Sequence, residues 1–405
     1  MPLHLTLFLL AGLLILALLL NPLAERLRLP FAVLLIAAGF AGSELLVGLG
    51  LDTGLRADSF HDLIFYVFLP VLIFESAFKI DTRMLLRNLL PILIVAIPVM
   101  LFSTLITAVL VYYGIGHPSG FPWIAALLTG ALLSATDPVA VVELFRKLGA
   151  PERLCVVMEG ESLFNDATAI VVFGIFLYLA MNPQEQVDIA DAALRFLTLF
   201  FGGLLVGLFV GLAFWLLSRA FADELALQGL ITLLSAYVAY LTAEVVLHLS
   251  GVMAVLVTAL VMGRIIRRDY PPECGLFVNQ FWTLNAFLAN SLVFLLMGAT
   301  ITLPMFQERW LAMSIGIASV LLARAAGLFG SLPLVSLLPG VERIPFGYQR
   351  VMVWGGVRGA VTIALALSLP LELDYWWTVQ SIAFGVVLFT LLVQAPTIPW
   401  AVKKI

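Results

Sequence analysis

The chain has 405 residues, of which 62% are hydrophobic and only 11% are charged, and its formal net charge is −4. Soluble domains carry about 25% charged residues, so this composition excludes a soluble globular protein. The apolar stretches are continuous and do not alternate with polar residues, which excludes a transmembrane β-barrel. The sequence therefore predicts an all-α polytopic membrane protein that forms a single membrane domain over residues 1–405.

About 13 stretches are apolar and long enough to cross a bilayer as helices. In chain order they cover residues 5–20, 30–49, 60–79, 89–114, 122–146, 154–181, 191–218, 227–249, 251–266, 277–302, 310–338, 349–370 and 375–401. The first stretch lacks the basic segment and cleavage site of a signal peptide, so we expect it to remain as the first span.

Basic residues predict the orientation of these spans, because cytoplasmic loops carry an excess of Lys and Arg. Of the 21 Lys and Arg residues, Arg324 and Arg358 fall inside spans, and only Arg56, Arg195 and Arg309 lie in or beside the outer connections. The other sixteen lie on the opposite side. We therefore expect an inner or plasma membrane protein with its N-terminus outside and its C-terminus in the cytoplasm.

The spacing of the spans predicts an internal repeat. Adding about 220 to the limits of the first six spans gives the limits of the last six. The first repeat would cover residues 5–181 and the second residues 227–401, with residues 191–218 as a linker helix. Because the first repeat starts outside and the second starts inside, the repeats are inverted, as in secondary transporters.

Helix-breaking residues occur at matching places in the two repeats. Pro138 interrupts LLSATDPVAVV, and Gly355, Gly356 and Gly359 surround Arg358 about 220 positions later. Irregular backbone at membrane depth is tolerated where it is buried in protein or lines a cavity. We expect two discontinuous helices that meet at a substrate site, with Asp137 and Arg358 neutralising the partial charges of the half-helix ends.

The segment EGESLFNDATAIVVF places Asp166 near the middle of the span 154–181. A carboxylate at this depth is energetically unfavourable and usually functional. On a helix, Ser162 and Asp166 share one face, whereas Glu161 and Asn165 share another.

Other polar residues also fall inside predicted spans. Glu75 follows a kink expected at Pro70, and Arg324 requires an acidic partner, for which Glu161 is the expected candidate. The four histidines fall near span ends, where solvated positions are expected, and a pH-sensing role for one of them is the alternative.

Five motifs carry a resemblance to a known family. They are FLPVLIFESAF (68–78), SATDPVAVV (134–142), EGESLFNDATAIVVF (159–173), ARAAG (323–327) and WGGVRGAVTIALALSLP (354–370). In this order they resemble the monovalent cation/proton antiporters, specifically the NhaP-like sodium/proton exchanger branch. The resemblance implies a homodimer of thirteen-helix inverted repeats with two crossing discontinuous helices.

The resemblance also implies roles for individual residues. Asp166 would bind cation and proton in turn, and Asn165 would replace the first carboxylate of the Asp-Asp pair of electrogenic relatives. The implied cation-site residues are Ser162, Glu75, Thr136 and Asp137, with the cation itself at Asp166, Ser162, Glu75 and Thr136. Glu161 and Arg324 would form a structural ion pair. Pro138, Gly355, Gly356, Arg358 and Gly359 would support the broken helices.

The expected function is electroneutral exchange of Na⁺ or Li⁺ for H⁺, with cation and proton competing for Asp166. A K⁺/H⁺ antiporter remains the alternative within transport. A cation channel is disfavoured because a channel needs several weak sites, and an organic-anion carrier because the polar face is acidic. The chain lacks a phosphate-binding glycine motif, so we expect no bound nucleotide. We also expect no enzyme activity, no cofactor and no nucleic-acid partner, and we expect membrane lipid to surround the protein.

Overall fold

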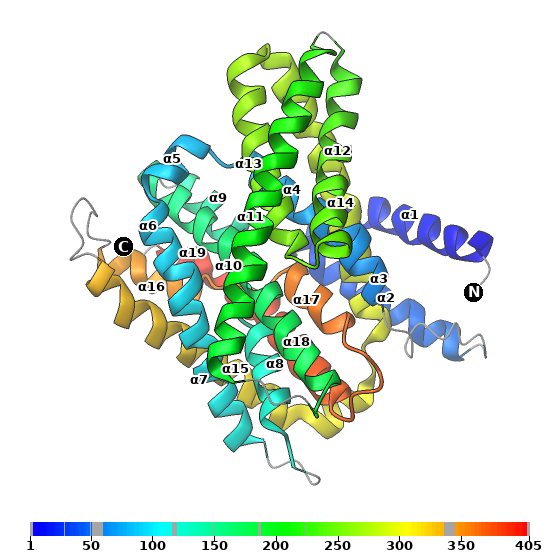
Figure 1. The fold of residues 1–405 in the computed structure, drawn as a ribbon. Helices are drawn as coiled ribbons and strands as arrows, with labels where there is room; N and C mark the ends of the chain where they lie inside the picture. Colours follow the sequence, from blue (N-terminus) through cyan, green and yellow to red (C-terminus); the bar gives the residue numbers. More distant parts are fainter. Residues whose placement is uncertain are drawn as a thin grey trace.

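The computed structural model describes residues 3–27, 29–48, 50, 60–115, 120–147, 149–184, 188–222, 224–335 and 345–402. Over these residues the chain is almost entirely helical (Figure 1). Nine helical runs within this part are long and apolar enough to cross a membrane by length and composition, and further apolar helices are shorter. The prediction of an all-α polytopic membrane protein is therefore confirmed, while the count of thirteen spans stays a prediction.

Every predicted span overlaps one helix or a run of consecutive helices. Up to residue 181 these are α1 (Leu3–Leu27), α2 (Phe31–Gly48), α3 (His61–Leu63), α4 (Leu69–Lys79), α5 (Thr82–Arg87), α6 (Leu89–Ile94), α7 (Met100–Gly114), α8 (Trp123–Leu132), α9 (Val139–Lys147) and α10 (Glu152–Met181). Beyond it they are α11 (Ile189–Arg219), α12 (Leu225–Leu241), α13 (Gly251–Asp269), α14 (Pro272–Thr300), α15 (Leu303–Val335), α16 (Phe346–Trp354), α17 (Ala360–Leu367), α18 (Trp376–Phe389) and α19 (Ala395–Val402).

Wide π-helical turns occur beside or around two of the prolines. The turn η1 (Ile64–Phe68) ends just before Pro70, and η2 (Val95–Val99) contains Pro98. Proline lacks the N–H that an α-helix needs and its ring collides with the preceding turn. A wider turn relieves both problems, so the helix bends without ending. The expected kink at Pro70 therefore takes the form of a π-helical turn that precedes α4.

The two predicted breaks are present. The backbone is non-helical between α8 and α9 and again between α16 and α17. The two non-helical segments cross, and the amide of Asp137 donates a hydrogen bond of 2.8 Å to the carbonyl of Val357 in an antiparallel bridge. Each broken segment thus satisfies part of its unpaired backbone through the other.

Long helices surround this crossing. Among the closest packed pairs are α2 with α14, α4 with α13, α7 with α15, and α15 with α18, and α11 lies along α13 (Figure 1). The contact between α2 and α14 depends on Gly39 and Gly298. A Cβ at either position would lie 2.2 Å from a carbonyl oxygen of the other helix, so only glycine allows this approach.

Two contacts join residues that are 220 positions apart. One is the bridge between Asp137 and Val357, and the other is the hydrogen bond from Ser103 Oγ to the carbonyl of Ala323. Residues related by a twofold axis touch each other only near that axis, so both contacts are consistent with inverted repeats offset by this number. The division into residues 5–181, 191–218 and 227–401 stays a prediction.

Candidate functional site

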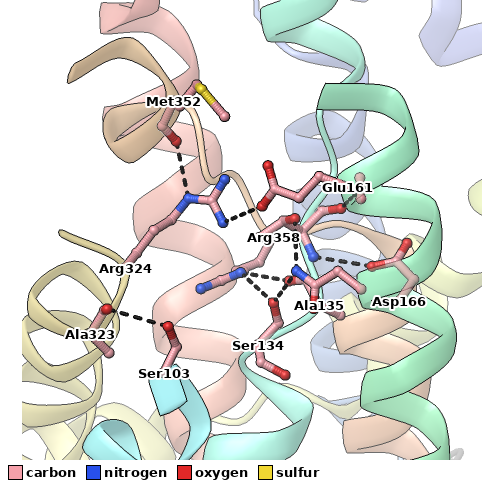
Figure 2. Close-up of polar contacts among 12 residues, drawn as sticks. Ser103, Ser134, Ala135, Glu161, Asp166, Ala323, Arg324, Met352 and Arg358 are labelled. Atoms are coloured by element: carbon pink, nitrogen blue, oxygen red, sulfur yellow. Dashed lines mark hydrogen bonds and ion pairs between the residues drawn. The ribbon is translucent and has the colours of Figure 1, made fainter. Parts of the chain in front are cut away.

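Asp166 lies in the interior of α10, where the helix passes the break between α8 and α9. The backbone amide of Thr136, in that break, donates a hydrogen bond of 3.1 Å to Asp166 Oδ1 (Figure 2). This donor is available because residues 133–138 are not helical and their amides have no partner within a helix. The broken segment therefore holds the carboxylate at membrane depth.

Two neighbours of Asp166 on α10 bind the same segment. Ser162 donates its hydroxyl proton to the carbonyl of Thr136. Asn165 donates through Nδ2 to the carbonyl of Ser134 at 3.0 Å and to Thr136 Oγ1 at 3.3 Å. Asn165 needs its two amide protons for this role, and a carboxylate at that position would have none to donate.

A cavity of about 440 Å³ reaches Asp166 from one end of the molecule. One wall is formed by α4 together with Asn290 of α14, and the other by the broken segment, α10 and the beginning of α17. Its lining includes Ser162, Thr136, Asp137 and Asp166. The cavity therefore connects a group of oxygen atoms at the helix break with the end of the molecule where α4 finishes.

Paired charges line the mouth of this cavity. Glu75 pairs with Lys79 one turn further along α4, and Glu159 pairs with Arg146 at 2.9 Å. The Lys79 and Arg146 side chains are 41% and 49% exposed, so both lie where the cavity meets solvent. The direct partner of Glu75 is thus a lysine at the mouth, although its carboxylate shares the cavity with Asp166.

The ends of the broken helices are matched by opposite charges. Arg358 Nη1 donates to the carbonyls of Ser134 and Ala135, at 3.0 and 2.8 Å, where α8 ends (Figure 2). Asp137 Oδ1 accepts a hydrogen bond of 3.0 Å from the amide of Val139, where α9 begins. Carbonyl ends of helices favour cations and amide ends favour anions, so each charge lies at the matching end.

Asp137 also lies against the start of α17. A Cβ on Gly359, the residue before α17, would come within 2.7 Å of Asp137 Oδ2. Glycine at this position lets the carboxylate approach the amide ends of both α9 and α17. The predicted neutralisation of half-helix ends by Asp137 and Arg358 agrees with these positions.

The end of α16 is capped by a corresponding set of groups. Gln394 Nε2 donates to the carbonyl of Trp354 at 3.0 Å, and Arg324 Nε donates to that of Met352 at 3.0 Å. Trp354 is 220 positions after Ser134, whose carbonyl accepts from Asn165 at 3.0 Å. A side-chain amide from the following long helix therefore caps the first half-helix in both broken helices.

Glu161 and Arg324 form the ion pair that the sequence predicts. Arg324 Nη1 lies 3.3 Å from Glu161 Oε1, and the two side chains are only 12% and 5% exposed (Figure 2). The pair joins α10 to α15 beside a cavity of about 20 Å³ that Asn165 and Arg358 also line. This small cavity is on the other face of α10, so Asn165 and Asp166 line different cavities.

The structure thus brings most of the predicted site residues together. Ser162, Asn165, Asp166, Thr136 and Asp137 meet at the crossing. Glu75 lines the same cavity but pairs with Lys79 at its mouth. Its role as a direct cation ligand therefore stays a prediction. Pro138 lies immediately before α9, where a missing N–H causes no loss.

Several residues of the crossing were not identified from the sequence. Thr390 Oγ1 accepts from the amide of Arg358 at 3.2 Å, Thr362 Oγ1 donates to the carbonyl of Ala135 at 3.5 Å, and Asn290 lines the large cavity. All three are polar residues within apolar runs. Many Ser and Thr residues in the chain also lie within apolar runs, and their hydroxyls bond only their own helix. A polar residue in an apolar run is therefore not enough to identify Thr390, Thr362 or Asn290.

Comparison with known proteins agrees with this geometry. The sequence model for the transmembrane region of sodium/hydrogen exchangers matches residues 12–404. The chain belongs to the sodium/hydrogen exchanger family. This match begins within α1 and includes the crossing and both cavities.

The alignments with individual relatives cover most of the chain. The Na⁺/H⁺ antiporter ApNhaP of Aphanothece halophytica is 38% identical over 381 residues, which cover 93% of this chain and 70% of that protein. NhaG of Bacillus atrophaeus, also named a Na⁺/H⁺ antiporter, is 34% identical over 93% of this chain and 70% of its own length. The solved structure of the sodium proton antiporter MjNhaP1 from Methanocaldococcus jannaschii has a similar fold, with a TM-score of 0.84 at 21% identity, over 100% of this chain and 99% of that one.

Proposed function

We propose that the protein is a secondary antiporter that exchanges Na⁺, or Li⁺, for H⁺ by alternating access. The observation that carries the proposal is the position of Asp166, a buried carboxylate held by a broken helix at the inner end of a cavity. Unwound carbonyls and half-helix ends are the usual cation ligands of secondary transporters. Membership of the exchanger family and the names of the relatives support the same activity.

The cation would bind Asp166 together with oxygen atoms of Ser162 and Thr136. Hard cations prefer carboxylate, carbonyl and hydroxyl oxygens, and all three types converge here. The amide of Thr136 and the hydroxyl of Ser162 hold these groups in place. Glu75 would contribute after separation from Lys79. A proton on Asp166 would replace the cation during the return step.

The exchange would be electroneutral, one cation for one proton. Asn165 uses its amide as a donor to the broken helix and has no proton that it could exchange near neutral pH. Asp137 is held at the starts of α9 and α17. Asp166 is then the residue that carries either cation or proton, so the net charge moved in a cycle is zero.

The proposed setting is the inner or plasma membrane, with the cavity open to the cytoplasm and the N-terminus outside. Lys79 and Arg146 at the cavity mouth belong to the basic side of the chain, and basic residues are retained in the cytoplasm. A homodimer surrounded by lipid is proposed from the family resemblance.

Reconstitution in proteoliposomes tests the exchange directly. A gradient of Na⁺, Li⁺ or K⁺ is imposed in turn, and the internal pH is followed with a trapped dye. We expect Na⁺ and Li⁺ to drive proton movement, with an unchanged rate when a membrane potential is imposed through valinomycin and K⁺. Asp166→Asn provides the control for leakage.

Each outcome has a distinct meaning. Movement driven by K⁺ alone would support the K⁺/H⁺ alternative. Cation flux without coupled proton movement would support a channel, and clear acceleration by the potential would contradict one-for-one exchange.

A further inference from the structure

The short helix α17 begins at the large cavity and ends on the opposite side of the crossing. Its first turn, Ala360–Thr362, lines the large cavity. Its last turn lies at the other end of the helix, where Leu365, Ala366, Leu367 and Ser368 have carbonyls that no later turn can pair. The partners of these carbonyls therefore reveal what covers the far end of α17.

Two of the four carbonyls are paired by groups from α17 and the helix that follows it. Ser368 Oγ donates to the carbonyl of Leu365 at 2.9 Å, and Gln380 Nε2 of α18 donates to that of Ala366 at 3.1 Å. These bonds lie within one continuous part of the chain. They can persist when α17 and α18 move together.

The other two carbonyls are paired by the beginning of the helix that ends in α4. The amide of Phe60 donates to the carbonyl of Leu367 at 3.3 Å, and His61 Nδ1 lies 3.3 Å from the carbonyl of Ser368. Since a carbonyl only accepts, Nδ1 carries the proton. The His61 ring stacks on Phe65 with centroids 4.5 Å apart, so His61 is held and half-buried, in contrast to the expected solvated position.

The same two helices therefore separate at one end and touch at the other. Toward Lys79, α4 and the start of α17 form opposite walls of the cavity. Toward Phe60, the chain before α4 closes on the end of α17 (Figure 1). An exchanger must open each side in turn, so the contact at Phe60 and His61 would have to break when the far side opens.

We propose that Phe60 and His61 form a latch that keeps the far side closed, and that His61 makes this latch sensitive to pH on that side. His61 acts as a positioning residue through the end of α17. The proposal rests on exchange by alternating access, as proposed above. It adds a specific contact that differs between the two access states and a specific direction of pH control.

Charge determines the direction of the effect. An imidazolium at the carbonyl end of a helix is stabilised relative to neutral imidazole, by an amount that corresponds to about a two- to fivefold change in an equilibrium. His61 has this partner only while the latch is closed. Acid on the far side, which favours the imidazolium, therefore favours the closed latch.

Within the part of the chain that the structure describes, three elements bring charged groups near His61. Glu244 on the turn η3 (Thr242–Val246) interacts electrostatically with both His61 and His248, and its carboxylate accepts from the amide of Gly251 at 2.8 Å. Asp62 is exposed on the same helix. The turn after Ser368 carries Glu372 and Asp374, both exposed. These acidic groups are the same in the parent and in a His61 variant. A pH effect that differs between the two proteins is therefore due to His61.

The first experiment links the latch covalently. Phe60→Cys and Leu367→Cys are combined in a chain whose two buried cysteines are replaced, Cys155→Ala and Cys274→Ala. The backbone hydrogen bond at 3.3 Å brings these positions close enough for a disulfide. We expect oxidation to abolish exchange, a reductant to restore it, and Na⁺ to still raise the melting temperature of the oxidised protein, because the cavity side stays open.

A matched pair controls for the chemistry of oxidation. Leu199→Cys and Ser250→Cys also flank a backbone hydrogen bond between separate elements, at 3.2 Å, but they join α11 to the start of α13, which pack along each other. Oxidation of this pair should leave exchange unchanged. If the first pair does not express, His61→Cys with Ser368→Cys links the same contact.

The second experiment measures pH control in membrane vesicles of one orientation. The pH is varied on the far side and held constant on the cavity side. Relative to the parent, His61→Gln, which keeps a neutral donor, should exchange about two- to fivefold faster at acidic far-side pH and equally fast at alkaline pH. A uniform change at both pH values would mean that His61 is only structural and would overturn the pH control.

The outcomes separate this inference from the proposed function. A cysteine-free parent that exchanges no cation for protons would contradict the proposed function. A parent that exchanges, together with an oxidised Phe60–Leu367 pair that exchanges at the same rate, would overturn the latch alone.

Discussion

At the scale of single residues, adjacent positions on α10 perform different tasks because a helix turns by 100° per residue. Asp166 faces the large cavity, whereas Asn165 and Glu161 face the small one. Replacing one of these side chains should therefore affect either transport or stability. Two predictions follow from this separation.

The first concerns competition at Asp166. If cation and proton share this carboxylate, the apparent KM for Na⁺ should rise as the pH falls, by up to about tenfold per pH unit in the acidic range, following mass action. Initial rates at several Na⁺ concentrations and pH values give this KM. Asp166→Asn should abolish exchange in a folded protein, and Asp166→Glu should retain some. A KM that stays constant over two pH units would require separate sites for cation and proton.

The second prediction concerns the buried pair of Glu161 and Arg324. Removal of one partner leaves the other charge unpaired, and such changes typically lower stability by about 3–5 kcal/mol. Glu161→Gln should therefore lower the melting temperature or the yield. Adding Arg324→Gln to Glu161→Gln should recover part of the loss, because both charges are then absent.

A transport measurement distinguishes the structural role of Glu161 from a ligand role. In the fraction of Glu161→Gln that folds, the KM for Na⁺ should remain close to the parent value. Normal stability with complete loss of cation binding would identify Glu161 as a ligand instead.

At the scale of elements, four half-helix ends meet at the crossing, and the ends of α8 and α16 and the start of α9 are each matched by a group of suitable charge or hydrogen-bonding capacity. This matching depends on glycines that leave room for the charged side chains. Gly356 is the clearest case, because a Cβ there would lie 2.4 Å from Cδ and Nε of Arg324. The broken segment can therefore pass Arg324 only without a side chain.

We predict that Gly356→Ala displaces Arg324 from the carbonyl of Met352 and from Glu161. Overpacking of this kind typically lowers stability by about 1–3 kcal/mol. Its effect should be less than additive with that of Glu161→Gln, since both disturb one contact. Gly174→Ala is the matched control, because a Cβ on Gly174 in α10 meets no atom within 4 Å. Melting temperatures in one detergent test this, and equal temperatures for the two alanine variants would refute it.

At the scale of the whole molecule, orientation rests on the distribution of charge, because the fold itself is compatible with either direction of insertion. Lys79 and Arg146 at the cavity mouth belong to the predicted basic side of the chain. Predicted outer connections include the turn with Asp374, and predicted inner ones the turn with Arg268. The C-terminal residues 403–405, Arg56, Arg343 and His117 lie outside the described part of the chain.

Labelling of single cysteines tests the orientation. In the cysteine-free background, Asp374→Cys should react with a membrane-impermeant maleimide added to intact cells, whereas Arg268→Cys should react only after the membrane is opened. Both positions are exposed in the structure. The reverse pattern of labelling would place the N-terminus inside and the cavity on the outer side.

The sequence by itself determined the membrane class, the positions of most helices, both helix breaks and the pairing of Glu161 with Arg324. These follow from local and one-dimensional properties: hydrophobic length, Pro and Gly within apolar runs, and the rule that a buried charge needs an opposite charge. Ser162 and Asp166 could be assigned to one face because helical periodicity is fixed.

Only the tertiary structure decided which atoms meet. The capping of Trp354 by Gln394 and the contact of His61 with Ser368 join groups whose sequence neighbourhoods give no sign of the partner. Unpaired carbonyls of a broken helix can be satisfied by any donor within about 3 Å, and many polar side chains in the chain would suit. The choice among them is made by the packing of distant helices, which hydrophobic patterns along the chain do not specify.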